Sequence, residues 1–496
     1  MTMQPDHNSD AQDLARFGYR QELKRSMGGF SSFAAGFSYI SILTGLFQMF
    51  HLGYGTAGPA FFWTWPVVLC GQLLVALCFA DLAAQYPLSG GVYQWAKFTG
   101  TRFTGWMTGW IFLACLVTTI AAVALALQVS LPQIAGSFQL IGDRTVPEDA
   151  AVNAILLGTV LIAASTLINA RGIRLLAMLN NAGVFAELIG IVVLLVLLFY
   201  HALRSPAEAV AISAVTQGST GFSSLVAAAA LTASYVLYGF DTAGSLAEET
   251  IDPRRRAPRA ILQALLAAGL SGMLVLLFAL MAAPESIAAS LGQASGGLPL
   301  LVRVVLGEIP GRIFLTVVIF AIIVCTLAVH SGTVRLMYAM GRDNLLPFSK
   351  WLSTVSPKWQ TPVNATFVAG IGAVVILLVN LEFPRVVELV ASIAILWANL
   401  GYLIVVTVQL FNRRKQQGNA IDQHRFLGPR TGMVINLLAV CWSLFMVINV
   451  GWPRTSTYGS EWYNQWAALL YTIVLVTSGI IIYFYRKKHQ PHQQPS

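Results

Sequence analysis

The chain has 496 residues, of which 56% are hydrophobic and 10% are charged, and its formal net charge is +9. Soluble globular proteins average about 25% charged residues, so this composition excludes a soluble domain and predicts a polytopic membrane protein. The positive residues lie in short segments between apolar stretches, where they set membrane orientation. This distribution argues against nucleic acid as a partner and makes membrane lipid the expected surroundings.

Twelve apolar segments follow one another along the chain, and a transmembrane helix needs about 20 such residues. They cover residues 27–52, 59–80, 103–131, 152–170, 178–200, 222–247, 260–283, 312–337, 363–381, 386–410, 431–452 and 465–485. The sequence therefore predicts an all-α polytopic membrane protein with about twelve transmembrane helices. The linker 284–311 is expected to form an outer surface helix or lid, and residues 335–347 are expected to follow the inner surface.

The distribution of Lys and Arg predicts how these helices are oriented. With the N-terminus in the cytoplasm, 24 of the 30 Lys and Arg residues fall on the cytoplasmic side and the other 6 on the outer side. Cytoplasmic loops carry such an excess, and a missed or invented helix would invert every later loop. The asymmetry thus predicts an even number of helices and cytoplasmic termini. The polar N-terminus lacks the order of a cleaved signal peptide.

Polar and glycine-rich stretches interrupt the first and sixth apolar segments, at Gly36 to Gly45 and at Tyr238 to Ser245. A break in a helix at mid-membrane is tolerated only where protein encloses it. Breaks in the first and sixth of ten helices are typical of two inverted five-helix repeats with a substrate site between them. Close helix packing by small residues is the alternative explanation. Within the first stretch, the break is expected between Ser41 and Gly45.

A broken helix presents unpaired amides on one half and unpaired carbonyls on the other, which suits a zwitterionic ligand. The predicted carboxylate-binding residues are Ser41, Thr44 and Gly45, at the start of a half-helix, and the predicted amine-binding residues are Tyr238, Gly239, Phe240 and Asp241. Amides at a helix start bind anions without a cationic side chain. A carboxylate, carbonyls and an aromatic ring face together suit an ammonium group.

Four further acids lie in or beside the apolar segments. Glu187 is close to mid-depth in the fifth segment, where an ionised carboxylate is costly and usually functional, so we expect it to gain and lose a proton during transport. A protonated acid bonded to a neighbouring helix is the alternative. Asp81, Glu248 and Glu249 lie near inner ends beside Arg-rich loops. They are expected to form solvated ion pairs or to close an inner gate.

The cysteines and histidines show no metal-ligand spacing. All five cysteines lie inside apolar segments without a CxxC motif, and we interpret them as core-packing residues. Only His51 and His330, of seven histidines, lie in or beside the segments. The sequence predicts no metal site and no cofactor.

Several motifs resemble the amino acid–polyamine–organocation (APC) superfamily, and most closely its amino acid/choline transporter group of γ-aminobutyrate and choline permease-like proteins. The motifs lie at residues 17–26, Gly36 to Gly45, 80–93, 239–258 and 335–347. The resemblance implies a LeuT-like five-plus-five inverted repeat with broken helices 1 and 6 and two extra helices. It also implies import of amino acids or small amines, often with a proton.

One short stretch and one acid depart from the superfamily pattern, and one further residue matches a position where relatives have a polar residue. Leu43-Thr44-Gly45 stands where relatives usually have Gly-Ser-Gly, and Glu187 stands where some relatives carry a lysine. A mechanism based on that positive charge therefore does not transfer to this chain. The resemblance implies a substrate contact for Thr119, in the third segment.

The sequence thus predicts a secondary active transporter of an amino acid or related small amine in a bacterial-type plasma membrane. Proton symport is the preferred mechanism, sodium coupling or exchange the alternative, and an enzyme or a receptor the least expected. The predicted parts are a cytoplasmic segment (1–25), a ten-helix transport core (26–414), two additional helices (415–485) and a cytoplasmic tail (486–496). The oligomeric state and the particular substrate are not predicted.

Overall fold

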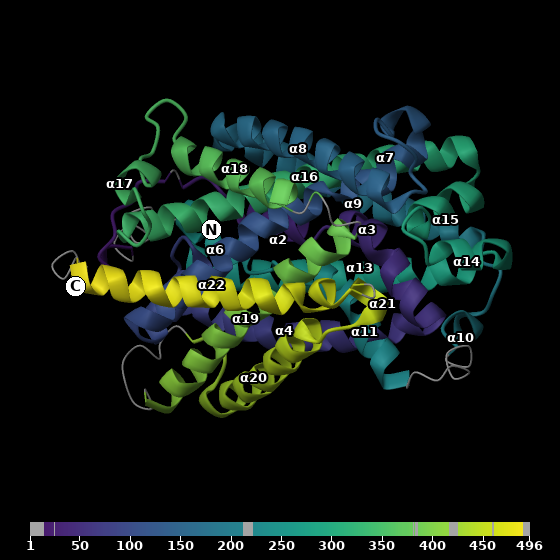
Figure 1. The fold of residues 1–496 in the computed structure, drawn as a ribbon. Helices are drawn as coiled ribbons and strands as arrows, with labels where there is room; N and C mark the ends of the chain where they lie inside the picture. Colours follow the sequence, from purple (N-terminus) through teal and green to yellow (C-terminus); the bar gives the residue numbers. More distant parts are fainter. Residues whose placement is uncertain are drawn as a thin grey trace, which may run out of the picture.

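The computed structural model describes residues 14–23, 25–211, 222–379, 381, 385–415, 425–458 and 461–489, and these ranges contain helices and no β-strand. Most of the long helices run roughly along one axis of the molecule (Figure 1). A helix satisfies its own backbone hydrogen bonds, which is the requirement for a segment in lipid. The predicted all-α architecture is confirmed.

Each of the twelve predicted segments has a helical counterpart. In chain order they are α2 (Gly29–Ile40) with α3 (Ile42–Ala57), α4 (Thr64–Gln85), α6 (Arg102–Ala124) with α7 (Ala126–Ile134), α8 (Pro147–Ala170), α9 (Ile173–Tyr200), α11 (Phe222–Val236) with α12 (Thr242–Ser245), α13 (Pro253–Ala282), α16 (Glu308–Arg342), α18 (Val363–Val379), α19 (Val386–Lys415), α20 (Pro429–Gly451) and α22 (Trp462–His489). The first and sixth counterparts are broken helices, as predicted.

Nine helices of the described chain are long and apolar enough to cross a membrane. One of them, Gly29–Gln85, contains the first two predicted segments. The ninth segment, α18, is a shorter apolar helix, and the sixth is divided between α11 and α12. The nine long helices are therefore compatible with twelve membrane crossings.

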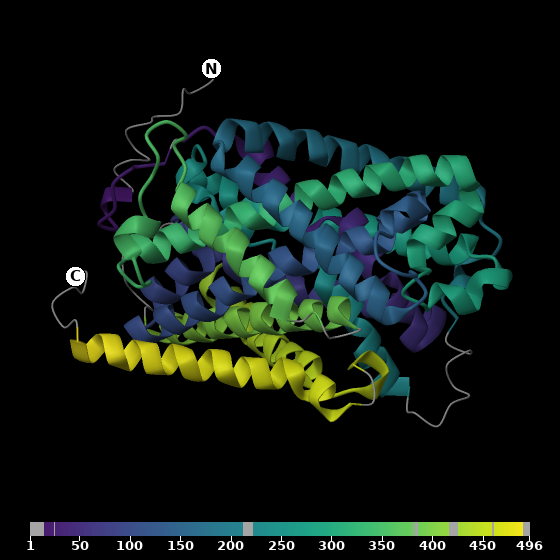
Figure 2. The same cartoon turned by 45° about the horizontal axis from the view of Figure 1, so that its top comes forward.

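The short connecting helices gather at the two ends of the bundle. α10 (Pro206–Ala209), α14 (Ala288–Leu291) and α15 (Gly297–Leu306) lie at one end, whereas α17 (Ser349–Leu352) and the last turns of α22 lie at the other (Figures 1 and 2). α10, α14 and α15 belong to linkers predicted for the outer side, and α17 belongs to one predicted for the inner side. Residues 1–13 and 490–496, within the predicted terminal segments, lie outside the described residues.

The two broken helices lie beside each other in the bundle. α11 packs against α3, and α12 packs against α2. α13 runs along α2 and α4, while α16 contacts both halves of the first broken helix as well as α6 and α9. α20 and α22 contact α19, and α22 lies along the outside of the bundle (Figure 2). This arrangement encloses the breaks in protein, which their exposed backbone groups require.

The expected path of residues 335–347 along the inner surface is wrong for its first part. α16 continues without interruption to Arg342, and Arg335 is 4% exposed. The helix continues because the Arg335 guanidinium has a buried partner, the Glu249 carboxylate at 2.9 Å. A buried arginine is unfavourable unless it is paired in this way.

Candidate functional site

The first broken helix changes direction at Ser41. α2 ends at Ile40, α3 begins at Ile42, and Ser41 between them has φ +35°. A residue with a side chain rarely adopts a positive φ, so its surroundings must hold it there. Its hydroxyl accepts a hydrogen bond from the Thr44 amide at 3.3 Å and lies 2.7 Å from the Thr44 hydroxyl. The break thus begins where the sequence predicts it.

Glu187, on α9, faces this break. The residue is 2% exposed, and its Oε1 accepts hydrogen bonds from the Ser41 hydroxyl at 2.9 Å and from the Leu43 amide at 3.1 Å. The first amides of a helix lack intrahelical partners and attract negative charge. Glu187 therefore occupies the amide end of α3, which is the place predicted for a ligand carboxylate. The sequence indicated its depth but not this contact, which depends on how α9 packs beside α2.

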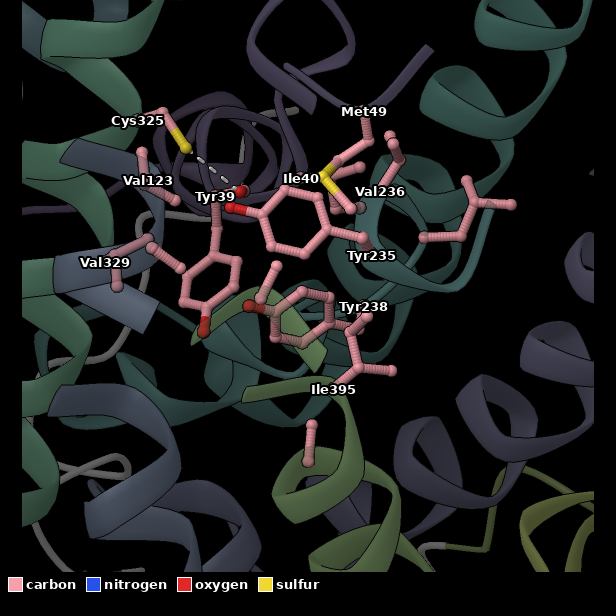
Figure 3. Close-up of a cluster of buried hydrophobic side chains, with 14 of the residues drawn as sticks. Tyr39, Ile40, Met49, Val123, Tyr235, Val236, Tyr238, Cys325, Val329 and Ile395 are labelled. Carbon is pink, nitrogen blue, oxygen red and sulfur yellow. Dashed lines mark hydrogen bonds between the residues drawn. The ribbon is translucent and has the colours of Figure 1, made fainter. Parts of the chain in front are cut away.

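Cys325 supports the carbonyl end of the same break. Its thiol, on α16, donates to the Tyr39 carbonyl oxygen at 3.3 Å (Figure 3). The last carbonyls of a helix such as α2 also lack intrahelical partners. Cys325 is buried, as predicted, but it does more than fill space. A lone cysteine in an apolar segment gives no sequence signal for such a contact.

The second broken helix unwinds between Val236 and Thr242. Gly239 in this segment has φ +88°, a conformation that favours glycine. A Cβ atom at Gly239 would lie 1.9 Å from the Tyr39 ring of α2, a distance that no real contact allows. Glycine is therefore required both by the backbone and by the approach of Tyr39. This approach brings the two breaks together.

Tyr402, on α19, forms hydrogen bonds with the second break, and no sequence pattern indicated this role. Its hydroxyl donates to Asp241 Oδ1 at 2.5 Å and accepts a hydrogen bond from the Gly239 amide at 3.1 Å. Asp241 thus holds the unwound segment through Oδ1. Tyr402 was missed because residues 161 positions apart meet only through packing.

Aromatic side chains fill the region between the breaks (Figure 3). The Tyr238 hydroxyl lies 3.0 Å from the Thr119 hydroxyl, and its ring meets the Tyr39 ring edge-on with centroids 5.8 Å apart. Tyr235, beside Tyr238, donates to Gln48 Oε1 at 2.9 Å. The other labelled neighbours are Ile40, Met49, Val123, Val236, Cys325, Val329 and Ile395. The predicted residues Thr119 and Tyr238 therefore meet within a largely apolar surround.

Two of the predicted ligand-binding residues are engaged in packing. A Cβ atom at Gly45 would lie 2.8 Å from a Val236 methyl carbon, so Gly45 lets α3 and α11 approach closely. The Phe240 ring lies 5.9 Å from Phe79 and 5.5 Å from Tyr402, centroid to centroid. Both residues shape the site through these contacts, and the polar groups come from their neighbours.

Three ion pairs close the end of the bundle that carries α17. They join Asp81 to Arg413, Glu248 to Arg342 at 2.9 Å, and Glu249 to Arg335 at 2.9 Å. The predicted ion pairing is present, but its predicted solvation is wrong, because the three acidic side chains are at most 1% exposed. Each acid lies under neighbouring helices instead of in the adjoining loop. Such buried pairs depend on both partners.

The segment before α2 lies across the same end. Met27 pairs with Thr250 as an isolated β-bridge, and the Tyr19 hydroxyl donates to Asp343 Oδ1 at 2.9 Å. Burial and the Asp343 carboxylate raise the pKa of Tyr19 above its ordinary value, so this hydroxyl keeps its proton. Lys97 bridges Tyr19 and Asp343 with two bonds of 2.8 Å. The N-terminal segment therefore adds to the closure of this end.

The opposite end is hollowed. A cavity of about 720 Å³ lies between α3, α7, α8, the segment 292–295 and α19. In its lining, His51 Nε2 lies 3.2 Å from Glu388 Oε1, while His51 Nδ1 is buried without a hydrogen-bond partner within the described ranges. His51 is seven residues, or two helical turns, beyond Thr44 on α3. The cavity thus approaches the first break from this side.

The fold and the site together define a class of protein. Two helices broken in mid-span, with a buried carboxylate at one break and an aspartate at the other, characterise a transporter that binds its substrate near the membrane midplane. Buried ion pairs join helices at one end, and a cavity lies at the other. This combination defines a multi-pass membrane transporter.

The comparison with known proteins gives the family. A model of the amino acid permease family matches residues 27–477, and the chain belongs to this family. It is 26% identical over 468 residues to amino-acid permease BAT1 of Arabidopsis thaliana, with 89% of each chain covered. It is 27% identical over 507 residues to the branched-chain amino acid permease BcaP of Bacillus subtilis, covering 97% of this chain and 98% of the relative. The GABA-specific permease of Saccharomyces cerevisiae is 23% identical over 494 residues, covering 97% and 85%.

These findings confirm the resemblance to the APC superfamily that the sequence motifs indicated. They make the protein an amino acid transporter of the membrane.

Proposed function

We propose that the protein is a secondary active transporter that carries an amino acid, or a related small amine, together with a proton across the plasma membrane. The observation that carries the proposal is the Glu187 carboxylate, buried against the Ser41 hydroxyl and the Leu43 amide at the first break. A proton-binding group at the substrate site allows the binding of the proton and the binding of the substrate to influence each other. Ionised carboxylates at such depth are costly and usually functional.

The proposed substrate site uses both breaks. Ser41 and Thr44 bind the substrate's carboxylate, with Gly45 letting α3 and α11 approach closely beside them. Tyr238, Gly239 and Asp241 bind its amine, with Phe240 packed behind them. Thr119 contacts the substrate between the two groups, and Glu187 carries the proton. The Asp241 carboxylate, buried at the second break and bonded through Oδ1 to Tyr402, supports the amine end of this assignment. The aliphatic and aromatic surround in Figure 3 supports a substrate with a small apolar body.

The proposed orientation places the closed end in the cytoplasm, together with both termini. Most Lys and Arg residues belong to that end by the charge count, which supports the assignment. The cavity above His51 and Glu388 then opens to the outside and admits the substrate. The names of the bacterial and fungal relatives, a branched-chain amino acid permease and a GABA-specific permease, support small amino acids as the substrate class.

Uptake into proteoliposomes tests this function. Purified protein is reconstituted in sodium-free buffer, and radiolabelled amino acids and amines are supplied with and without an inward proton gradient. We expect at least one small amino acid to accumulate with the gradient and to leak out when a protonophore is added. Accumulation that requires sodium, or that occurs only in exchange for internal amino acid, contradicts proton symport. Protein-free liposomes are the control.

A further inference from the structure

The hydrogen-bond donors at the start of α3 are already occupied by the protein itself. The Leu43 amide donates to Glu187 Oε1, and so does the Ser41 hydroxyl. The Thr44 amide donates to the Ser41 hydroxyl, and the Gly45 amide donates to the Ser41 carbonyl oxygen at 2.9 Å. The Leu43 amide and the Ser41 hydroxyl become free for a substrate carboxylate only when Glu187 gives them up.

No positively charged side chain in the described part of the chain stabilises the ionised form of Glu187. No Lys, Arg or His in the described part of the chain forms an ion pair with it. The titratable group facing it from α16 is the Cys325 thiol, and the Ser41 hydroxyl and the Leu43 amide face it from the broken helix. Its ionised form therefore depends on the donors at this break.

Two carboxylates cannot share these donors while both are ionised, because like charges at such short range repel strongly in a low-dielectric site. One of them must carry a proton. The α-carboxyl group of an amino acid is ordinarily a stronger acid than a glutamate side chain, so the proton goes to Glu187. Protonated Glu187 no longer needs the amides.

Ser38 provides a further polar group near this helix end. The Ser38 hydroxyl lies on α2, three residues before Ser41, and the residue is 1% exposed. It has no hydrogen-bond partner among the described residues. A buried hydroxyl is normally paired, so Ser38 is available to either the displaced Glu187 side chain or the substrate.

We propose that Glu187 and the substrate's carboxylate compete for the amides at the start of α3, so that each carboxylate-bearing substrate binds together with one proton taken up by Glu187. The inference rests on the proposed substrate site and names its substrate class, amino acids with a free carboxylate. The proton comes from the outer solution and joins a Glu187 oxygen as the substrate binds. It leaves on the inner side as Glu187 returns to the amides. An amine without a carboxylate leaves Glu187 in place and takes up no proton.

Calorimetric titration in two buffers of different ionisation enthalpy tests the competition, because the difference between the measured enthalpies gives the number of protons taken up. The probes are the best-transported amino acid and the amine formed by removing its carboxylate. For the wild-type protein we expect about one proton per amino acid, an affinity that falls tenfold per pH unit once Glu187 is ionised, and no proton uptake with the amine.

Two variants accompany this measurement. Glu187→Gln is expected to bind the amino acid without proton uptake and with an affinity that does not change with pH. Glu308→Gln is the matched control, because the Glu308 side chain is 59% exposed, and it is expected to behave like wild type. If wild-type protein binds and transports the amino acid without proton uptake, or if the amine takes up as many protons, the competition is wrong and the transport function stands. If no amino acid binds, both proposals fail.

Discussion

Replacing Arg335 by methionine is expected to open the end of the bundle that carries α17, which the proposed orientation places in the cytoplasm. The Arg335 guanidinium lies 2.9 Å from Glu249 Oε1, and the two side chains are 5% and 1% exposed. Removing one partner of a buried ion pair leaves an uncompensated charge and costs about 3–5 kcal/mol. A loss of about 3 kcal/mol lowers the ratio of closed to open molecules roughly 150-fold, since each 1.4 kcal/mol is a factor of ten.

A double-mutant cycle separates the charge effect from lost packing. Glu249→Gln combined with Arg335→Met removes both charges, and the closed state is expected to recover most of its loss. The assay is labelling of Thr242→Cys, buried on α12, by a membrane-impermeant maleimide added to inside-out vesicles. Parent protein without this cysteine gives the background. Labelling that is as fast in the double variant as in Arg335→Met refutes the reasoning, as does an unchanged rate in Arg335→Met.

Three further changes give distinct expected results. Tyr402→Phe removes two hydrogen bonds from the second break, and the one to a carboxylate is worth ~1.5–3 kcal/mol. The variant is therefore expected to raise KM for uptake about tenfold or more, and an unchanged KM argues against this role. Gly239→Ala is expected to abolish uptake and lower the melting temperature, whereas Gly332→Ala, whose added Cβ meets its nearest atom at 3.7 Å, is expected to change neither. His51→Leu leaves Glu388 without its hydrogen bond from His51, and the free energy of unfolding is expected to fall by about 1–3 kcal/mol. A melting temperature equal to that of wild type contradicts this expectation.

Local sequence was sufficient to predict the helices and the positions of the breaks. Apolar runs of transmembrane length give the segments, and glycine and hydroxyl residues mark the interruptions, because lipid imposes the same requirement on every span. Ser41 and Gly239 carry a positive φ within the predicted stretches. These features depend on residues close together in the chain.

The contacts that complete the site depend on residues far apart in the chain, and the sequence did not predict them. Tyr402 reaches Asp241 from α19, and Cys325 reaches the Tyr39 carbonyl from α16. A tyrosine or a cysteine in an apolar helix is usually a packing residue, so neither position stands out. The assignment of Glu249 to a solvated pair was wrong for the same reason, since its burial arises from helices that meet only in the folded protein.

The most direct test of the account compares accumulation with exchange in Glu187→Gln proteoliposomes. Accumulation against a gradient requires the proton, whereas exchange of external for internal amino acid requires only the substrate site between the two breaks. The account predicts that the variant exchanges amino acid at a rate close to that of wild type but does not accumulate it under an inward proton gradient. Accumulation to the wild-type level by Glu187→Gln would contradict the account.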